Sequence, residues 1–317
     1  MADNKNPVDE VLKIFKNGWN RQVILYGPPG TSKTYSSTII AAAMLDAKYA
    51  EKESKTYEDA SKVLKDTADR YKFVQFHPSY SYEDFVRGIT VKTDNGTIKY
   101  EPEAKIIEKF CKVCKKSENS GKPCVMVIDE INRAPLASVL GELIYGLEYR
   151  GEEFTTPYEI GTKATLSIPD NLYIIGTMNT ADRSIGSIDY AVTRRFAFVQ
   201  VPSEPNAIAG SWKEIGKDVE NLYDALMDAE NGIFSQKFLA DPETDVADIK
   251  IGHTYFLGKG KNSNLSPEDE IAYMNYRIDY QIRPIYMEYI KDGIITKEGE
   301  KKFDEKIKEF RKSQTAQ

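Results

Sequence analysis

A glycine- and proline-rich turn that leads into Lys33 and Thr34 is the stretch of the sequence best suited to chemistry. An apolar run (23–26) precedes the turn, and an alanine-rich helical segment follows it. Backbone N–H groups in such a turn can surround a phosphate chain, and the start of the helix adds positive partial charge. Lys33 would contact the β- and γ-phosphates, and the Thr34 hydroxyl would ligate Mg²⁺. The residues predicted to contact a nucleotide here are Gly27, Pro28, Pro29, Gly30, Thr31, Ser32, Lys33, Thr34 and Tyr35.

Ser32 departs from the usual pattern of a phosphate-binding loop, G-x-x-x-x-G-K-[ST], because it stands in place of the second glycine. Serine keeps the backbone N–H and adds a side chain close to the phosphates. We therefore expect phosphate binding, and Ser32 leaves open its strength and the rate of turnover. The alternative is a strand, turn and helix without a ligand, and the acidic residues described next argue against it.

Two adjacent carboxylates end a second apolar run. Residues 124–128 predict a buried parallel strand, and Asp129 and Glu130 follow directly. Ligands of open α/β sheets bind beyond the carboxyl ends of the strands, where the glycine-rich turn also lies. Asp129 would hold Mg²⁺, through water, and Glu130 would orient and polarise an attacking water. A further buried strand (172–178) ends at Asn179, which is placed to hold that water near the γ-phosphate.

Consecutive cations, Arg194 and Arg195, follow a predicted short helix over 188–193. Such arginines can reach the γ-phosphate held by a neighbouring subunit, as an arginine finger does. The alternative interpretation is a helix C-terminus at which cations complement the helix dipole.

An α/β fold is predicted around these residues, followed by a mostly helical region. The composition shift at 201–205 places the domain boundary there, giving an α/β domain over 1–204 and a helical domain over 205–317. A helix should begin at Pro7, and Asn-Gly at 95–96 predicts a hairpin over 90–100. The other predicted elements are helices over 35–50, 51–72, 102–118 and 136–148, strands over 73–76, 124–129 and 172–179, and a second hairpin over 150–168.

Composition restricts the class of protein. The chain has 317 residues, a net charge of −6 and three cysteines. No apolar run reaches membrane-spanning length, and the polar N-terminus lacks a signal core, so we expect a cytoplasmic protein in a reducing compartment. The negative charge means that any DNA contact must be indirect or come from local basic loops, such as Lys92 and Lys99 beside Tyr100; a solvated hairpin is the alternative. Cys111 and Cys114 have no second pair for a zinc site.

The sequence resembles the AAA+ motors of the McrB family over about residues 6–290. The most specific match is Met178-Asn179-Thr180-Ala181-Asp182-Arg183-Ser184, which is similar to the signature of that family. The segments 76–85, 129–134 and 252–256 also match. The departures from the family pattern are Ser32 and Thr193, where a third arginine is common. The resemblance implies a P-loop NTPase AAA+ fold, with a parallel sheet flanked by helices and a C-terminal helical lid domain.

The resemblance also implies roles for single residues. Asn179 would be the first sensor, Asp182 and Arg183 would belong to the signature loop, and Arg194 and Arg195 would face the nucleotide of the neighbour. Arg283 is a candidate second sensor of the lid, with a plain lid surface as the alternative. His77 and His253 lie in family motifs, and we expect structural hydrogen bonding from them rather than acid–base catalysis.

The function implied is Mg²⁺-dependent hydrolysis of GTP, or of ATP, by a ring, expected to be a hexamer. The ring would drive a separate nuclease of the McrC type in the restriction of modified or foreign DNA. Two alternatives remain open: an ATP-driven protein remodeller of the MoxR kind, and a nucleotide-gated assembly module with little turnover, the latter suggested by Ser32.

Overall fold

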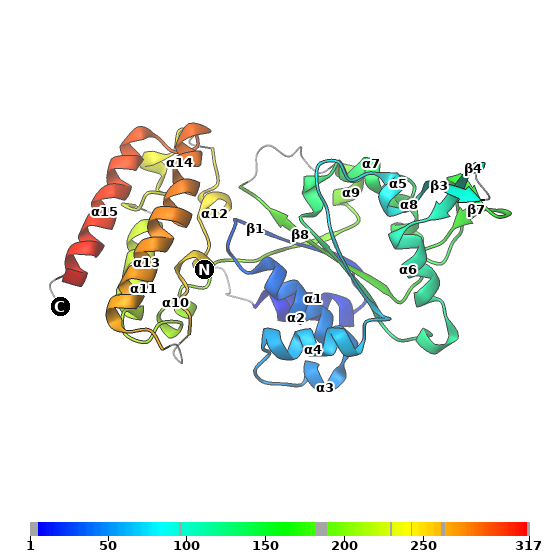
Figure 1. Ribbon diagram of the computed structural model, residues 1–317, viewed down its shortest axis with the longest axis horizontal. Helices are drawn as coiled ribbons and strands as arrows, with labels where there is room; N and C mark the ends of the chain where they lie inside the picture. Colours follow the sequence, from blue (N-terminus) through cyan, green and yellow to red (C-terminus); the bar gives the residue numbers. More distant parts are fainter. Residues whose placement is uncertain are drawn as a thin grey trace. The chain divides into compact units, whose positions relative to one another are not determined.

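The structure is a computed structural model that describes residues 6–94, 97–181, 189–228, 230–241, 243–260 and 264–315. It separates into two compact units (Figure 1). The α/β unit holds the residues up to 26 and 33–200, and the helical unit holds 27–32 and 201–317. The predicted domain boundary between residues 204 and 205 stays a prediction, because compactness alone does not define a folding domain.

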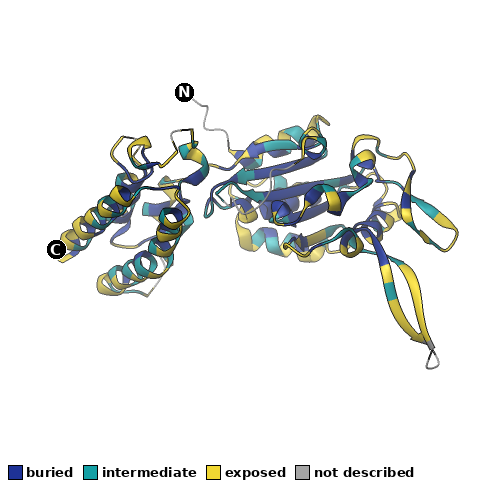
Figure 2. Ribbon diagram, turned by 90° about the horizontal axis from the view of Figure 1, so that it is seen from above, coloured by how far each residue is buried: buried dark blue, intermediate teal, exposed yellow. Residues whose placement is uncertain are grey.

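A five-stranded sheet forms the centre of the α/β unit. The strand order is β2-β5-β8-β1-β9, and β5 pairs in parallel with β2 and β8, as β1 does with β9. The predicted parallel sheet is therefore confirmed. The three central strands β5, β8 and β1 are buried along most of their length (Figure 2). The strand bounds are β1 Gln22–Gly27, β2 Tyr71–Gln75, β5 Cys124–Asp129, β8 Leu172–Asn179 and β9 Ala197–Gln200.

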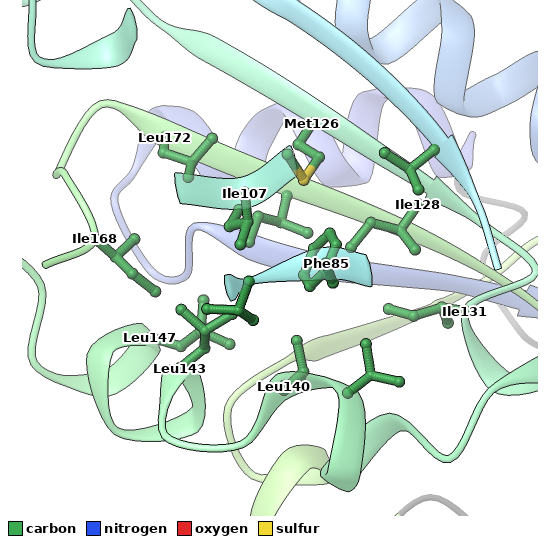
Figure 3. Close-up of a cluster of buried hydrophobic side chains, with 14 of the residues drawn as sticks. Phe85, Ile107, Met126, Ile128, Ile131, Leu140, Leu143, Leu147, Ile168 and Leu172 are labelled. Atoms are coloured by element: carbon green, nitrogen blue, oxygen red, sulfur yellow. The ribbon is translucent and has the colours of Figure 1, made fainter. Parts of the chain in front are cut away.

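Helices cover both faces of this sheet, which explains why β5 is apolar at nearly every position. On one face, α2 (Lys33–Leu45) packs against β5 and β8, with α1 (Pro7–Lys16) and α4 (Tyr57–Asp66) against α2. On the other face, Met126 and Ile128 of β5 belong to a buried apolar cluster (Figure 3). That cluster is completed by α5 (Tyr82–Phe85), α6 (Ile106–Cys114), α7 (Leu136–Leu140) and α8 (Leu143–Glu148).

Local capping explains where the predicted helices were right or wrong. Helix α1 begins as predicted, because the Asn6 side chain accepts from the Val8 N–H and Pro7 occupies the first turn. The predicted helix over 35–50 is wrong as one helix: α2 ends at Leu45, and Asp46 caps the short α3 (Ala47–Ala50). The helix over 136–148 is interrupted at Gly141, whose φ is 50°. In the charged segment 51–72 only α4 is helical, and residues 102–104 belong to a strand.

Both predicted hairpins are present. Strand β3 (Arg87–Asp94) pairs with β4 (Thr97–Ala104), and β6 (Phe154–Ile160) pairs with β7 (Lys163–Leu166). The Asn-Gly turn at 95–96 lies outside the described residues. Arg87 joins the two hairpins: its buried guanidinium pairs with Glu108 at 2.6 Å and donates to the carbonyls of Tyr158 and Thr165.

The helical unit confirms the prediction that residues 206–317 are mostly helical. Its core contains Trp212, Phe234, Phe256, Tyr286 and Phe303. A five-residue π-helical segment (Ile278–Ile282) joins α13 to α14, and His253–Phe256 form a single 3₁₀ turn. The helices are α10 Asn206–Gly210, α11 Gly216–Met227, α12 Val246–Ile249, α13 Pro267–Arg277, α14 Arg283–Lys291 and α15 Lys297–Thr315. Among the described residues, none of the helices combines the length and the apolar character needed to cross a membrane.

Candidate functional site

The loop Gly27–Thr34, called the phosphate loop below, connects β1 to α2 and is held by the segment that contains His253. The N–H of Gly252 donates to the Pro29 carbonyl at 2.8 Å, and the N–H of Thr254 donates to the Gly30 carbonyl at 3.1 Å. A Cβ at Gly252 would lie 1.9 Å from the Gly30 carbonyl oxygen. Glycine is therefore required at position 252 for this close approach of two backbones.

Hydrogen bonds at both nitrogens fix the ring of His253, and Ser203 Oγ lies 3.4 Å from its Nδ1. Its Nδ1 accepts from the Glu204 N–H at 3.0 Å, and its Nε2 lies 3.2 Å from Ser32 Oγ. The ring is buried, and burial lowers the pKa of His253 to about 4. The prediction of a structural hydrogen-bonding role for His253 is confirmed, and its contact with Ser32 is a feature that the sequence did not reveal.

Helix α2 starts at Lys33, so this lysine and Thr34 lie in its first turn. Lys33 is buried, and burial lowers the pKa of its ammonium group to about 8, although Glu130 and Asp129 act in the opposite direction. Thr34 Oγ1 donates to Asp129 Oδ1 at 2.9 Å. Two residues predicted to bind Mg²⁺ from segments far apart in the sequence are thus in direct contact.

Thr177 is a residue of this site that sequence reasoning missed. The register of β5 against β8 pairs Ile128 with Gly176, which brings Thr177 beside Asp129. Thr177 Oγ1 donates to Asp129 Oδ1 at 2.6 Å and accepts from the Glu130 N–H at 3.1 Å. The available signal was its position two residues before Asn179 on the same strand, which places both side chains on one face.

Glu130 and Asn179 are also brought together. Asn179 Nδ2 donates to Glu130 Oε1 at 2.7 Å, and Arg133 Nε lies 3.3 Å from Glu130 Oε2. Glu130 has a φ of 53°, in the left-handed region that non-glycine residues seldom adopt. Its side chain stays 19% exposed, so one carboxylate is positioned by the protein and still reached by water.

The donor set at this edge of the sheet fits the group that the sequence predicted. Mg²⁺ is bound by hard oxygen ligands and keeps several waters. Thr34 supplies a hydroxyl and Asp129 a carboxylate, with the two oxygens 2.9 Å apart. Lys33, which directly precedes Thr34 in the sequence, supplies a buried cation for the phosphate oxygens. The residues present therefore suit a Mg²⁺–triphosphate, and the assignment of Thr34 and Asp129 to the metal stays a prediction.

The two consecutive arginines are not equivalent. Arg194 follows the short helix α9 (Tyr190–Thr193), its side chain is 67% exposed, and its Nη2 lies 3.6 Å from Glu148 Oε2. The side chain of Arg195 is only 9% exposed and is paired with Glu148 at 2.6 Å. Arg195 also donates to the Ala191 carbonyl. The geometry favours Arg194 as the group available to a neighbour, and both assignments stay predictions.

Three further predicted site residues come from later segments of the chain. Asp182 and Arg183 of the predicted signature loop lie outside the described residues. Arg283 pairs with Asp304 at 2.8 Å and lies over the Phe303 ring. In the same unit, Arg277, which no sequence motif singles out, donates to the carbonyls of Thr254 and Tyr255. The sensor role of Arg283 stays a prediction.

Comparison with known proteins gives consistent matches. The family described as AAA domain (dynein-related subfamily) matches residues 22–196. The Type IV methyl-directed restriction enzyme EcoKMcrB subunit of Escherichia coli K12 is 31% identical over 278 residues, which are 86% of this chain and 54% of that protein. The Type II restriction enzyme BsuMI component YdiS of Bacillus subtilis 168 is 26% identical over 228 residues, which are 61% of each. The chain thus spans between half and two thirds of the length of these relatives.

Proposed function

The chain belongs to the dynein-related subfamily of AAA domains and is a McrB-type AAA+ protein, and from this premise we propose that it hydrolyses a nucleoside triphosphate with Mg²⁺. The observation that carries the proposal is the convergence of two predicted pairs at the carboxyl ends of β5 and β8. Thr34 contacts Asp129, and Glu130 contacts Asn179. The first contact joins the first turn of α2 to the end of β5, and the second joins the residue after β5 to the end of β8.

Each of these side chains has a role that follows from its chemistry. Lys33 would balance charge on the phosphates, because a buried ammonium interacts strongly with an anion. Thr34 and Asp129 would hold Mg²⁺, which when bound neutralises charge on the phosphate oxygens. Glu130 would accept a hydrogen bond from the attacking water, while the Asn179 amide keeps the carboxylate in place.

We further propose that hydrolysis is completed in a ring. Arg194 is exposed and lies on the α/β unit, so it is available to a neighbouring copy in the way an arginine finger requires. The ring would be a hexamer that uses GTP in preference to ATP. It would drive a nuclease of the McrC type in restriction of modified or foreign DNA. Support for this part comes from the similarity to two restriction-enzyme components.

Nucleotide titration and phosphate release test the proposal. Purified protein is titrated with GTP and with ATP in the presence of Mg²⁺, and release of phosphate is measured with and without a partner nuclease. GTP turnover that rises with the partner supports the restriction motor. ATP turnover without dependence on DNA or nuclease would indicate a MoxR-like remodeller, and no affinity for either nucleotide would refute the proposal. Lys33→Ala is the matched control and should abolish binding.

A nucleotide-gated assembly module is the second candidate, and Ser32 is the observation that favours it. A side chain in place of the second glycine adds a group beside the phosphates, and its φ of 68° is strained for serine. Tight binding with assembly but negligible phosphate release would select this candidate over the motor.

A further inference from the structure

Ser32 occupies a backbone conformation that favours glycine. Its φ is 68°, and among the described residues only one other non-glycine residue, Glu130, has a positive φ. Serine in this region is disfavoured because its Cβ approaches the backbone. A residue held in such a conformation needs support from its surroundings, and functional sites are where such conformations gather.

The hydrogen bonds of His253 determine which ring nitrogen carries the proton. A backbone N–H can only donate, so the 3.0 Å contact from the Glu204 N–H makes Nδ1 an acceptor. The neutral ring must then carry its hydrogen on Nε2. At 3.2 Å from Nε2, Ser32 Oγ is therefore the acceptor of this bond and His253 is the donor.

This direction has a consequence for the serine hydroxyl. A hydroxyl has one hydrogen to donate and can accept as well. Because Ser32 Oγ accepts from His253, its own hydrogen is available for a different acceptor. In the loop Gly27–Thr34 the acceptors expected from the proposed function are phosphate oxygens, and an O–H donor to a charged oxygen makes a strong hydrogen bond.

The ring that donates to Ser32 is itself fixed in place. The backbone N–H of His253 donates to Ser203 Oγ at 2.8 Å. The backbone N–H groups of its neighbours Gly252 and Thr254 donate to the carbonyls of Pro29 and Gly30 in the loop. The loop and the histidine therefore form one hydrogen-bonded assembly within the helical unit. Such an assembly reduces the ordering required when a ligand binds.

We propose that His253 is a positioning residue for phosphate binding, which orients the Ser32 hydroxyl so that its hydrogen donates to a phosphate of the bound nucleoside triphosphate. Ser32 thereby contributes a side-chain donor that a glycine at this position cannot supply. This inference rests on the proposed function, because it requires a nucleotide in the loop. It assigns a role to the departure at position 32, which otherwise looks like a defect.

Two substitutions of His253 separate the bond to Ser32 from the bond to Glu204. In His253→Asn, the short amide can still accept from the Glu204 N–H but cannot reach Ser32. In His253→Gln, the amide N–H₂ lies near the original position of Nε2 and can donate to Ser32. Dissociation constants are measured for fluorescent GTP and ATP analogues with Mg²⁺. His77→Asn, at the other histidine, which is exposed, is the matched control.

We expect His253→Asn to weaken nucleotide binding about fivefold, the loss of roughly one hydrogen bond, and His253→Gln to restore it. Ser32→Ala should weaken binding by a similar factor, and the double variant Ser32→Ala, His253→Asn should bind no more weakly than Ser32→Ala alone. Multiplicative losses in the double variant, or unchanged binding by His253→Asn, would overturn the proposal. Melting temperatures confirm that each variant is folded. Failure of the unaltered protein to bind any nucleotide would instead overturn the proposed function.

Discussion

Ser32 and Glu130 share an unusual backbone conformation and differ in what supports it. Each is a non-glycine residue with a positive φ, 68° and 53°, and they are the two such residues among those described. Each also belongs to a segment predicted from the sequence to act on phosphates. In both places a strained backbone carries a side chain that the proposed chemistry uses, which is where strain of roughly 1–3 kcal/mol tends to be retained.

The two residues differ in what holds them. Glu130 is held from the neighbouring strand: its N–H donates to Thr177 and its carboxylate accepts from Asn179. Ser32 is held by His253, 221 residues further along the chain. Strain at Glu130 is thus supported by the sheet itself, whereas Ser32 and its loop are supported by the His253 side chain and by the N–H groups of Gly252 and Thr254. We infer that Glu130 acts in the hydrolysis step and that Ser32 acts in nucleotide binding.

The largest effect is expected from Glu130→Gln. Glutamine keeps the shape of the side chain and an oxygen that can accept from Asn179, but it cannot accept a proton from water. Turnover should fall about 10³-fold, within the range typical of a lost general base, while the dissociation constant for the nucleotide changes little. Phosphate release and nucleotide titration measure the two quantities on the same preparation.

The exposed carboxylate Glu118 gives the control for this change. Glu118→Gln removes a charge from the same unit without touching the site and should keep full turnover. If Glu130→Gln hydrolysed at the rate of the unaltered protein, the assignment of Glu130 would be wrong, and its strained backbone would need another explanation.

The surroundings of Glu130 could be predicted from the sequence because they follow from topology. Apolar strands that alternate with helices form a parallel sheet, and the carboxyl ends of neighbouring strands meet at one edge. Asp129, Glu130 and Asn179 each end such a strand, so their proximity required no knowledge of side-chain packing. Thr177 was missed, since a threonine within an apolar strand reads as part of the sheet, and so was the contact of Arg133 with Glu130.

The surroundings of Ser32 could not be predicted in this way. The bond to His253 depends on a tertiary contact that no spacing in the sequence encodes. The closer pairing of Arg195 with Glu148, at 2.6 Å against 3.6 Å for Arg194, has the same origin, because the packing of α8 sets the position of Glu148. Helix breaks at Asp46 and Gly141 depend on a single cap and a single positive φ, which a pattern of apolar residues does not reveal.

The pH dependence of stability should report the burial of His253. An unfolded histidine takes up a proton near pH 6.5, whereas in the folded protein burial lowers the pKa of His253 to about 4. The unfolded state therefore binds more protons between these values, and stability is lost as the pH falls through this window. From pH 7 to pH 5 the loss from this group should be about 2 kcal/mol in the free energy of unfolding.

Urea unfolding of the intact chain and of His253→Gln at pH 7 and pH 5 isolates this contribution. Other groups titrate in both proteins, so the difference between their pH dependences is the informative quantity. The variant should lose about 2 kcal/mol less than the unaltered protein. Equal losses would mean that His253 is not buried as a neutral ring, and the direction of its bond to Ser32 would no longer follow.

The smallest effect is expected from Ser32→Gly. Glycine adopts a φ of 68° without strain, which should stabilise the fold by about 1 kcal/mol relative to serine. The same change removes the acceptor of the His253 Nε2–H bond, which costs about 1 kcal/mol. The two terms offset, so the free energy of unfolding should change by less than about 0.5 kcal/mol, whereas Ser32→Ala, which keeps the strain and loses the bond, should cost roughly 1 kcal/mol. Urea unfolding of both variants measures the difference. A glycine variant as unstable as the alanine variant would show that Ser32 carries no backbone strain. The comparison of Ser32 with Glu130 as two strained residues would then fail.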